Sequence, residues 1–407
     1  MDIQKIRTDF PILSQQIYGA PLVYMDNGAT TQKPKAVIDA LSQMYSACNA
    51  NIHRGMHYLS EQTTEAYERA RCSVRDFLNA ELSQEIIFTS GTTAGINIVA
   101  YSFGERFVNQ GDEIIISVME HHSNIVPWQM LCDRKGAHLR VIPITDNGEL
   151  MMDEYRKLLN KRTRLVAVTH VSNTMGTINP VKEIVRLAHD AGARVLIDGA
   201  QSVQHGKIDV QDIGCDFFTF SGHKIYAPTG IGVMYGRKEL LDEMPPFHGG
   251  GVMVEFVGLE KSTYNELPFK FEAGTANYID AVGLESAILY LEAIGMDVIA
   301  ACERDLMLYA REQLSKIEGM RFFGTAENKI ATFSFLLNNI HHFDTGMILD
   351  KMGIAVRTGT HCTQPLMQRF GIEGTVRASM AFYNTREEVD LLCNGLERVK
   401  KMMKLNN

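Results

Sequence analysis

Two stretches decide the fold of this 407-residue chain: Val195-Leu196-Ile197-Asp198 and Phe217-Phe218-Thr219-Phe220-Ser221-Gly222-His223-Lys224. Each is a short apolar run, typical of a buried β-strand, that ends in polar residues. Between about residues 85 and 236 such runs alternate with helical patterns. This alternation predicts a mostly parallel sheet covered by helices on both faces. The other runs are Glu85-Ile86-Ile87-Phe88, Ile114-Ile115-Ile116-Ser117, Leu165-Val166-Ala167-Val168-Thr169 and Gly232-Val233-Met234-Tyr235.

The polar ends of the two quoted stretches suggest a cofactor site. Asp198 stands 26 residues before Lys224, which follows a Ser-x-His approach. A pyridoxal phosphate (PLP) enzyme holds its cofactor with such a pair: the lysine amine binds the aldehyde, and the aspartate keeps the pyridine nitrogen protonated. A surface lysine and an ordinary strand-end aspartate would give the same letters, so this interpretation depends on the rest of the chain.

The bulk composition indicates a globular protein of two domains. The chain is longer than one ordinary core needs, and its 45% hydrophobic and 22% charged content is that of a soluble protein. A net charge of −8 argues against a nucleic-acid partner. The longest apolar runs are far shorter than a membrane span, so we expect no membrane association.

The N-terminus and the cysteines point to the cytoplasm. Residues 1–7 contain no apolar signal core. The seven cysteines are scattered, with no Cys-x-x-Cys pair, which favours free thiols in a reducing compartment over a disulfide framework or a zinc knuckle. We interpret six of them as inert small hydrophobes: Cys48, Cys72, Cys132, Cys215, Cys302 and Cys393.

A smaller α+β domain is predicted after about residue 280. A helical pattern through Leu284 and Ile294 precedes a strand at 331–335, a helix at 344–352, a strand at 355–357 and a helix from Arg386. We expect residues 21–285 to form the large cofactor-binding domain. Residues 1–20 together with 286–407 should form the small one.

Polar groups follow several predicted strands, and ligands of open α/β sheets bind at the carboxyl ends of strands. Thr92 and Thr93 follow the first strand and open a helix, where backbone N–H groups and hydroxyls would form a phosphate site. An ordinary helix cap has the same sequence. Asn173 and Gln201 lie at the ends of two later strands.

His121 follows the strand at 114–117, where its ring could stack on a pyridine or carry protons. The adjacent His122 could instead suggest a metal. Neighbouring positions rarely point at one ion, however, and no third ligand lies near, so we expect no metal site.

The last constellation is Arg357-Thr358-Gly359-Thr360-His361-Cys362, followed by Arg377. A cysteine in a glycine-containing loop near an arginine and a histidine can be a thiolate at neutral pH. A second arginine can hold a substrate carboxylate with its planar fork. Cys362 is therefore a candidate nucleophile.

Together these motifs resemble the group II, SufS-type cysteine desulfurases, which are PLP-dependent transferases of fold type I related to class-V aminotransferases. The resemblance implies an α/β large domain with a mostly parallel seven-stranded sheet, plus a smaller α+β domain. It extends over nearly the whole chain through Tyr24-Met25-Asp26-Asn27-Gly28-Ala29, His53-Arg54-Gly55, Glu120-His121-His122-Ser123-Asn124, Asp198-Gly199-Ala200-Gln201, Ser221-Gly222-His223-Lys224, Phe271-Glu272-Ala273-Gly274-Thr275 and the Cys362 loop.

The resemblance implies how the cofactor is held. Lys224 carries it covalently, Asp198 pairs with the pyridine nitrogen, Gln201 contacts the phenolic oxygen, and His121 stacks on the ring. Asn173 also contacts the cofactor. The phosphate is bound by side chains of both subunits of a homodimer: Thr92, Thr93, Ser221 and His223 from one, and Thr275 from the other.

The same resemblance implies the reaction. Asn173 and Arg377 hold the carboxylate of L-cysteine, with Arg357 near the nucleophile. Cys362 takes the substrate sulfur, L-alanine leaves, and the persulfide passes to a SufE-like or SufU-like acceptor for iron–sulfur cluster assembly. His121 carries protons.

Three alternatives stay open at this point. They are a selenocysteine lyase of the same family, an ordinary aminotransferase, and a PLP-fold scaffold without turnover.

The sequence departs from the pattern of this family at two positions. Thr360 replaces a histidine that many relatives have before the cysteine, which bears on the tuning of Cys362. His248, in Pro245-Pro246-Phe247-His248-Gly249-Gly250-Gly251, replaces an acidic or small residue and bears on the identity of the acceptor.

Overall fold

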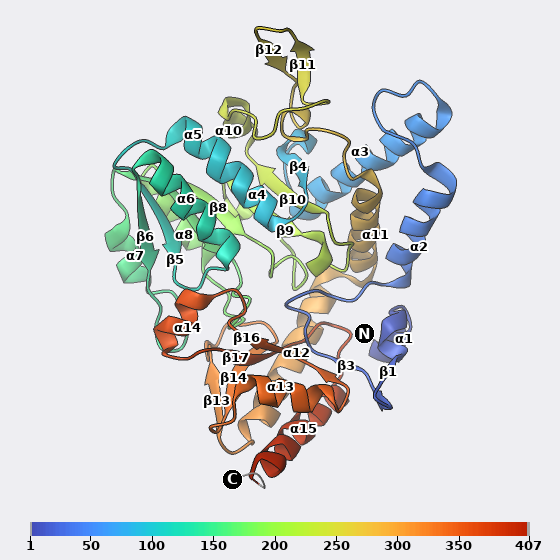
Figure 1. Ribbon diagram of the computed structural model, residues 1–407, viewed down its shortest axis with the longest axis vertical. Helices are drawn as coiled ribbons and strands as arrows, with labels where there is room; N and C mark the ends of the chain where they lie inside the picture. Colours follow the sequence, from blue (N-terminus) through green and yellow to red (C-terminus); the bar gives the residue numbers. More distant parts are fainter. Residues whose placement is uncertain (1, 405–407) are drawn as a thin grey trace.

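The computed structural model of the protein describes residues 2–404 and contains a seven-stranded sheet in the order β4-β10-β9-β8-β7-β5-β6 (Figure 1). Strands β5 to β9 pair in parallel, and β10 runs antiparallel to both of its neighbours. The predicted mostly parallel sheet is thus confirmed. The strands are β4 (Ile86–Thr89), β5 (Glu113–Ser117), β6 (His138–Ile142), β7 (Thr163–Thr169), β8 (Arg194–Asp198), β9 (Phe217–Ser221) and β10 (Gly232–Gly236).

Helices cover both faces of this sheet, because successive strand residues point to opposite sides. In β5, Ile114 and Ile116 belong to one apolar core, which includes Trp128 and Leu240. Ile115 belongs to the other core. Helices α4 (Thr92–Ile98), α6 (Val126–Lys135) and α10 (Lys238–Glu243) contribute to the first core. Helices α3 (Tyr58–Leu78), α8 (Val181–Asp190) and α11 (Tyr278–Ile294) contribute to the second.

A second, antiparallel sheet has the order β13-β14-β17-β16 and lies at the lower end of the molecule in Figure 1. Its strands are β13 (Met320–Phe323), β14 (Thr332–Leu337), β16 (Arg357–Gly359) and β17 (Thr375–Ser379). Helices α12 (Met296–Ser315), α13 (His342–Asp350) and α15 (Arg386–Lys404) pack with it around Phe333, Phe335 and Leu392. Helix α14 (Gln364–Phe370) follows the cysteine loop.

The N-terminal segment contacts residues next to both sheets: helix α15, and the segments that follow β9 and β17. Arg7, in α1 (Ile3–Arg7), forms an ion pair with Glu388 of α15 at 2.9 Å. Phe10 packs edge-on against Tyr226 and Phe382. The remaining elements are β1 (Gln16–Ile17), β2 (Ala20–Pro21), β3 (Val23–Tyr24), α2 (Lys35–Gln43), α5 (Gly104–Phe107), α7 (Met152–Leu158), α9 (Val210–Ile213), β11 (Val254–Val257), β12 (Ser262–Tyr264) and β15 (Ile354–Ala355). The domain boundaries given above stay a prediction.

Several elements depart from the sequence interpretation, which did not predict α12, α14, β13 or β17. The predicted strand at 355–357 is two strands: β15 pairs with β3, and β16 joins the second sheet. An apolar run of this length carries no information on which sheet it joins. The predicted helix at 344–352 begins two residues earlier, at His342. Strand β6 was missed because it is an edge strand with largely exposed side chains, which removes the apolar signal.

Among residues 2–404, no helix combines the length and apolar character that crossing a bilayer requires.

Candidate active site

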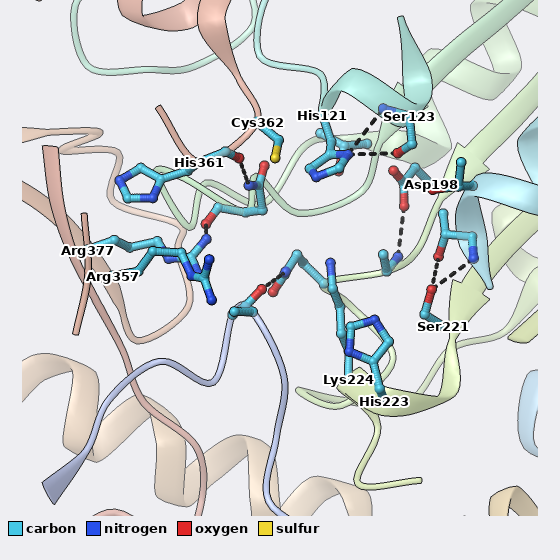
Figure 2. Close-up of a pocket in the computed structure, with 18 residues that line it drawn as sticks. His121, Ser123, Asp198, Ser221, His223, Lys224, Arg357, His361, Cys362 and Arg377 are labelled. Atoms are coloured by element: carbon cyan, nitrogen blue, oxygen red, sulfur yellow. Dashed lines mark hydrogen bonds between the residues drawn. The ribbon is translucent and has the colours of Figure 1, made fainter. Parts of the chain in front are cut away.

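A cavity of about 300 Å³ lies at the carboxyl ends of the large-sheet strands, where loops of both sheets meet (Figure 2). Its lining comes from segments far apart in the sequence. It includes every side chain expected at the site except Thr275: Thr92, Thr93, His121, Asn173, Asp198, Gln201, Ser221, His223, Lys224, Arg357, Cys362 and Arg377. The volume is within the range of small-molecule sites.

Lys224 enters the cavity from the turn after β9, and its amine makes no hydrogen bond or ion pair with any residue from 2 to 404. Burial lowers the pKa of this amine to about 8, and Asp198 partly opposes that shift. The residue before it is fixed, because the carbonyl of His223 accepts hydrogen bonds from Thr31 N at 3.1 Å and Lys33 Nζ at 3.0 Å. The backbone beside Lys224 is thus fixed, while its amine stays free to react.

Asp198 ends β8 and is 3% exposed. Its Oδ1 accepts a hydrogen bond from the backbone N–H of Ala200 at 2.9 Å. Burial raises the pKa of the carboxyl, and Lys224 and the Ala200 contact oppose the rise. A buried carboxylate needs a cationic or hydrogen-bonded partner, which a protonated ring nitrogen would supply.

Hydroxyl groups gather at the start of α4, opposite the loop of Cys362 in Figure 2. Ser221 Oγ accepts from Thr92 N at 2.8 Å and lies 2.9 Å from Thr92 Oγ1. Gly91 has φ +145°, and a Cβ there would stand 3.1 Å from Ser221 Oγ, so glycine permits this close approach. Together with Thr93 and His223, this corner offers hydroxyl and ring donors to an anion.

The hydrogen bonds of His121 define its tautomer. Nδ1 accepts the backbone N–H of Ser123 at 3.2 Å and lies 2.8 Å from Ser123 Oγ. A backbone N–H can only donate, so Nδ1 carries no hydrogen and the neutral ring carries it on Nε2. Burial, reinforced by Lys224, lowers the pKa of His121 to about 4. The ring is therefore neutral at pH 7, with one nitrogen that can donate.

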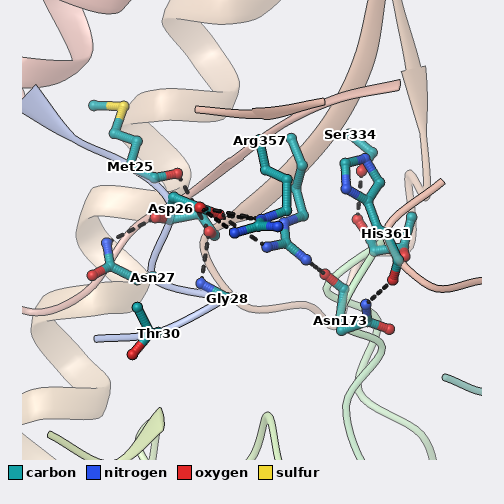
Figure 3. A network of polar contacts seen from close by, with 12 residues as sticks. Met25, Asp26, Asn27, Gly28, Thr30, Asn173, Ser334, Arg357 and His361 are labelled. Carbon is teal, nitrogen blue, oxygen red and sulfur yellow. Dashed lines mark hydrogen bonds and ion pairs between the residues drawn. The ribbon is translucent and has the colours of Figure 1, made fainter. Parts of the chain in front are cut away.

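Two arginines share one carboxylate at the other side of the cavity (Figure 3). Arg357 Nη2 lies 2.9 Å from Asp26 Oδ2, and Arg377 Nη2 lies 3.2 Å from Asp26 Oδ1. Arg377 is 2% exposed, donates from Nη1 to the carbonyl of Asn173 at 2.9 Å, and keeps Nε without a partner. Two cations facing one anion leave a positive corner that suits a substrate carboxylate.

The loop of Cys362 is held in an unfavourable backbone conformation. His361 has φ +52° and Cys362 has φ +58°, and such left-handed geometry costs about 1 kcal/mol or more per non-glycine residue. The carbonyls of both residues are caught: Asn173 Nδ2 donates to His361 O at 2.8 Å, and His122 N donates to Cys362 O at 2.9 Å. Cys362 is the one exposed cysteine of the seven.

Several contributors were not found from the sequence. Asp26 was quoted within a motif without a role, because its pairing with Arg357 and Arg377 joins segments more than 330 residues apart. Gly28, Ala29, Ser123, Thr169 and Ala200 also line the cavity. Thr275 lies elsewhere, in a second cavity of about 300 Å³ with Phe247 and His248. The side chains of residues 2–404 form no cluster of three metal-ligating groups.

The donor set fits PLP. An amine without a partner, a buried carboxyl, a neutral imidazole and a corner of hydroxyls match, in order, the aldehyde, the ring nitrogen, the ring face and the phosphate of this cofactor. When bound, PLP supplies an electron sink for the carbon atoms of an amino-acid substrate.

Comparisons with known proteins agree with this geometry. The class-V aminotransferase family matches residues 23–392. A cysteine desulfurase of Synechococcus elongatus is 52% identical over 98% of this chain, which spans only 64% of that longer protein. A probable cysteine desulfurase of Halalkalibacterium halodurans is 49% identical over 98% of both sequences. The crystal structure of the Escherichia coli cysteine desulfurase CsdA superposes with a TM-score of 0.92, at 38% identity and over 99% of each chain.

The sheet order, the composition of the cavity and these matches lead to one conclusion: the chain belongs to the class-V aminotransferase family, among its cysteine desulfurases.

Proposed function

We propose that the protein is a PLP-dependent cysteine desulfurase that converts L-cysteine to L-alanine and leaves the sulfur as a persulfide on Cys362. One observation carries the proposal. The one exposed cysteine lines the same cavity as Lys224, Asp198 and the arginine pair. An ordinary aminotransferase has no use for a thiol at this place. The 49–52% identity to cysteine desulfurases supports the same substrate.

Each residue has a role in this proposal. Arg377 and Asn173 bind the substrate carboxylate, and Arg357 keeps the neighbourhood of the thiol positive. Thr92, Thr93, Ser221 and His223 bind the cofactor phosphate, Asp198 and Gln201 hold the ring polar atoms, and His121 stacks on the ring.

The sulfur step is a substitution at the substrate sulfur. Lys224 Nζ takes the proton from the substrate Cα. The Cys362 thiolate then attacks the substrate sulfur, an S–S bond forms, and the C–S bond breaks with its electron pair going to carbon. The proton that the Cys362 thiol gives up passes through the His121 ring to the carbon that loses sulfur, and Lys224 returns its proton to Cα. The net change joins one thiol of the enzyme with one of cysteine to give a persulfide and alanine.

Mass spectrometry after incubation with L-cysteine tests the proposal. Alanine should form, and a tryptic digest should place one added sulfur atom on the peptide that contains Cys362. L-serine, which lacks sulfur, is the matched control and should give no mass increase. Sulfur found mainly on another cysteine, or alanine formed only when a 2-oxo acid is present, would overturn the assignment. If the persulfide passes to a SufE-like or SufU-like acceptor, adding that acceptor should raise the alanine rate.

We also propose that the active unit is a homodimer in which Thr275 completes the phosphate site of the neighbouring subunit. Thr275 is absent from the cavity of its own chain, although its loop is firmly held. Glu272, three residues before it, pairs with buried Arg71 at 2.7 Å and accepts from Tyr67 Oη at 2.9 Å. Such anchoring suits a side chain that reaches a site outside its own subunit.

Subunit mixing tests the shared site. Lys224→Ala and Thr275→Ala homodimers should each be impaired. In mixed dimers both lesions fall in one site and the other site is intact. Random exchange should therefore restore about a quarter of wild-type activity, since half of the dimers are mixed and half of their sites are whole. The rate of alanine formation measures this. Activity equal to the mean of the parents, after exchange is verified, would contradict a shared site.

A further inference from the structure

A small cavity outside the active site contains two cations without a carboxylate partner. It has a volume of about 170 Å³ and lies between the end of α12 and the edge of the second sheet. Its lining combines basic, hydroxyl and aromatic side chains: Arg311, Ser315, Phe322, Gly324, Thr325, Lys329 and Phe333. It shares no residue with the candidate active site.

Lys329 is unusual because it is buried without a counter-ion in the part of the chain that the structure describes. The residue is 8% exposed, its Nζ donates to the carbonyl of Gly324 at 2.7 Å, and it lies 4.9 Å from the centre of the Phe333 ring. No ion pair joins it to any residue from 2 to 404. Burial, reinforced by Arg311, lowers the pKa of Lys329 to about 7. Burial thus favours the neutral amine near pH 7, and an anion beside it would favour the charged ammonium.

Arg311 adds a second free cation to the same cavity. Its only hydrogen bond within the described chain is a long one, from Nη2 to the carbonyl of Ala326 at 3.5 Å. Glu303 and Asp305 line another cavity that Lys329 also lines, and each has another partner, although Glu303 Oε1 has none within residues 2–404. Glu303 lies 2.5 Å from the ring of His205 through Oε2, and both oxygens of Asp305 accept from Arg386. The guanidinium fork is thus available for a carboxylate.

Two phenylalanine rings that pack edge to face on each other form an apolar wall of the cavity. The rings of Phe322 and Phe333 stand 6.4 Å apart, inclined at 63°. A cavity of about 150 Å³ accommodates one benzene ring in other proteins, so this one is large enough for a single six-membered ring. The cations and the aromatic rings together describe one class of ligand.

We propose that this cavity binds a small aromatic carboxylate of the size of benzoate, with its carboxylate on Arg311 and Lys329 and its ring against the apolar wall that Phe322 and Phe333 form. Two backbone hydrogen bonds connect the segment that carries Lys329 with the active site. Asn328 O accepts from Ile178 N at 3.1 Å, and Ile330 N donates to Gly176 O at 2.9 Å. Both contacts hold the loop that carries Asn173.

The test combines location with affinity, using the holoenzyme. Crystals grown with 4-bromobenzoate should show anomalous bromine scattering in this cavity. Calorimetric titration with benzoate should show a site that is weakened at least about 10-fold by Arg311→Gln or Lys329→Met, as expected for loss of a charge-assisted hydrogen bond. Arg321→Gln, on β13 but outside the lining, is the matched control and should bind normally.

Benzamide, which has the ring without the charge, should bind at least about 10-fold more weakly than benzoate. Thermal unfolding of each variant shows whether it is folded, and the bromine position in the wild-type enzyme does not depend on any variant. Bromine found only beside Arg377, no measurable benzoate binding, or equal binding by all three variants would each overturn the proposal.

Discussion

Replacing Cys362 with serine should lower the rate of alanine formation from L-cysteine at least about 10³-fold, because removal of a catalytic nucleophile has effects of this size or larger. Serine has almost the same shape, so the left-handed backbone at this position and the two hydrogen bonds to the loop carbonyls stay possible. Binding of PLP should be unchanged, because the thiol is not part of the cofactor donor set. Alanine formation, absorbance and mass spectrometry measure the three effects.

Cys72→Ser is the matched control, since Cys72 is a half-buried cysteine on α3 that lies outside the cavity. It should form the persulfide on Cys362 at the wild-type rate. A Cys362→Ser enzyme that keeps more than a tenth of wild-type activity would show that another group accepts the sulfur, and the proposed chemistry would be wrong.

Replacing Lys224 with alanine should abolish turnover to a similar extent, by about 10³-fold or more, since both the covalent link and the proton acceptor are lost. Lys224→Arg separates charge from reactivity. It keeps a positive group near Asp198, but a guanidinium stays protonated at any accessible pH and cannot act as a base. Both variants should therefore be inactive, while the exposed Lys207→Ala control should behave as wild type.

The lowered pKa of Lys224 sets a direction for the pH dependence of cofactor capture. The neutral amine reacts with the aldehyde, and burial brings its pKa down to about 8. The rate at which the cofactor-free enzyme takes up PLP should thus rise between pH 7 and pH 9 and level off above. Stopped-flow absorbance measures this rate. A rate that still increases tenfold per unit above pH 9 would indicate an ordinary lysine.

Much of the site was predictable because its chemistry is local in sequence. Asp198 and Lys224 each follow an apolar run, so strand periodicity places both at one edge of the sheet. Cys362 was recognised by its polar neighbours. The pairing of Asp26 with two arginines could not be derived in this way, because no local pattern joins β3 to β16 and β17.

The fold shows the same limit. Apolar runs predicted six strands of the large sheet, and only the solvent-facing edge strand β6 was missed. The run at 355–357 was apolar enough to predict extended chain, but its division between two sheets depends on β3, which is too short to predict. Partner choice in a sheet is a tertiary property that side-chain periodicity does not encode.

The tethered cysteine loop has a consequence for sulfur delivery. The carbonyls of His361 and Cys362 are both hydrogen-bonded to loops of the large sheet, so the reach of the Cys362 sulfur is that of its own short side chain. If Cys362 carries the proposed persulfide, an acceptor has to bring its own reactive atom to the mouth of the cavity. In the proposed transfer, the mobile segment therefore belongs to the acceptor, and an acceptor whose thiol lies on a rigid, recessed surface should receive no sulfur even if it binds tightly.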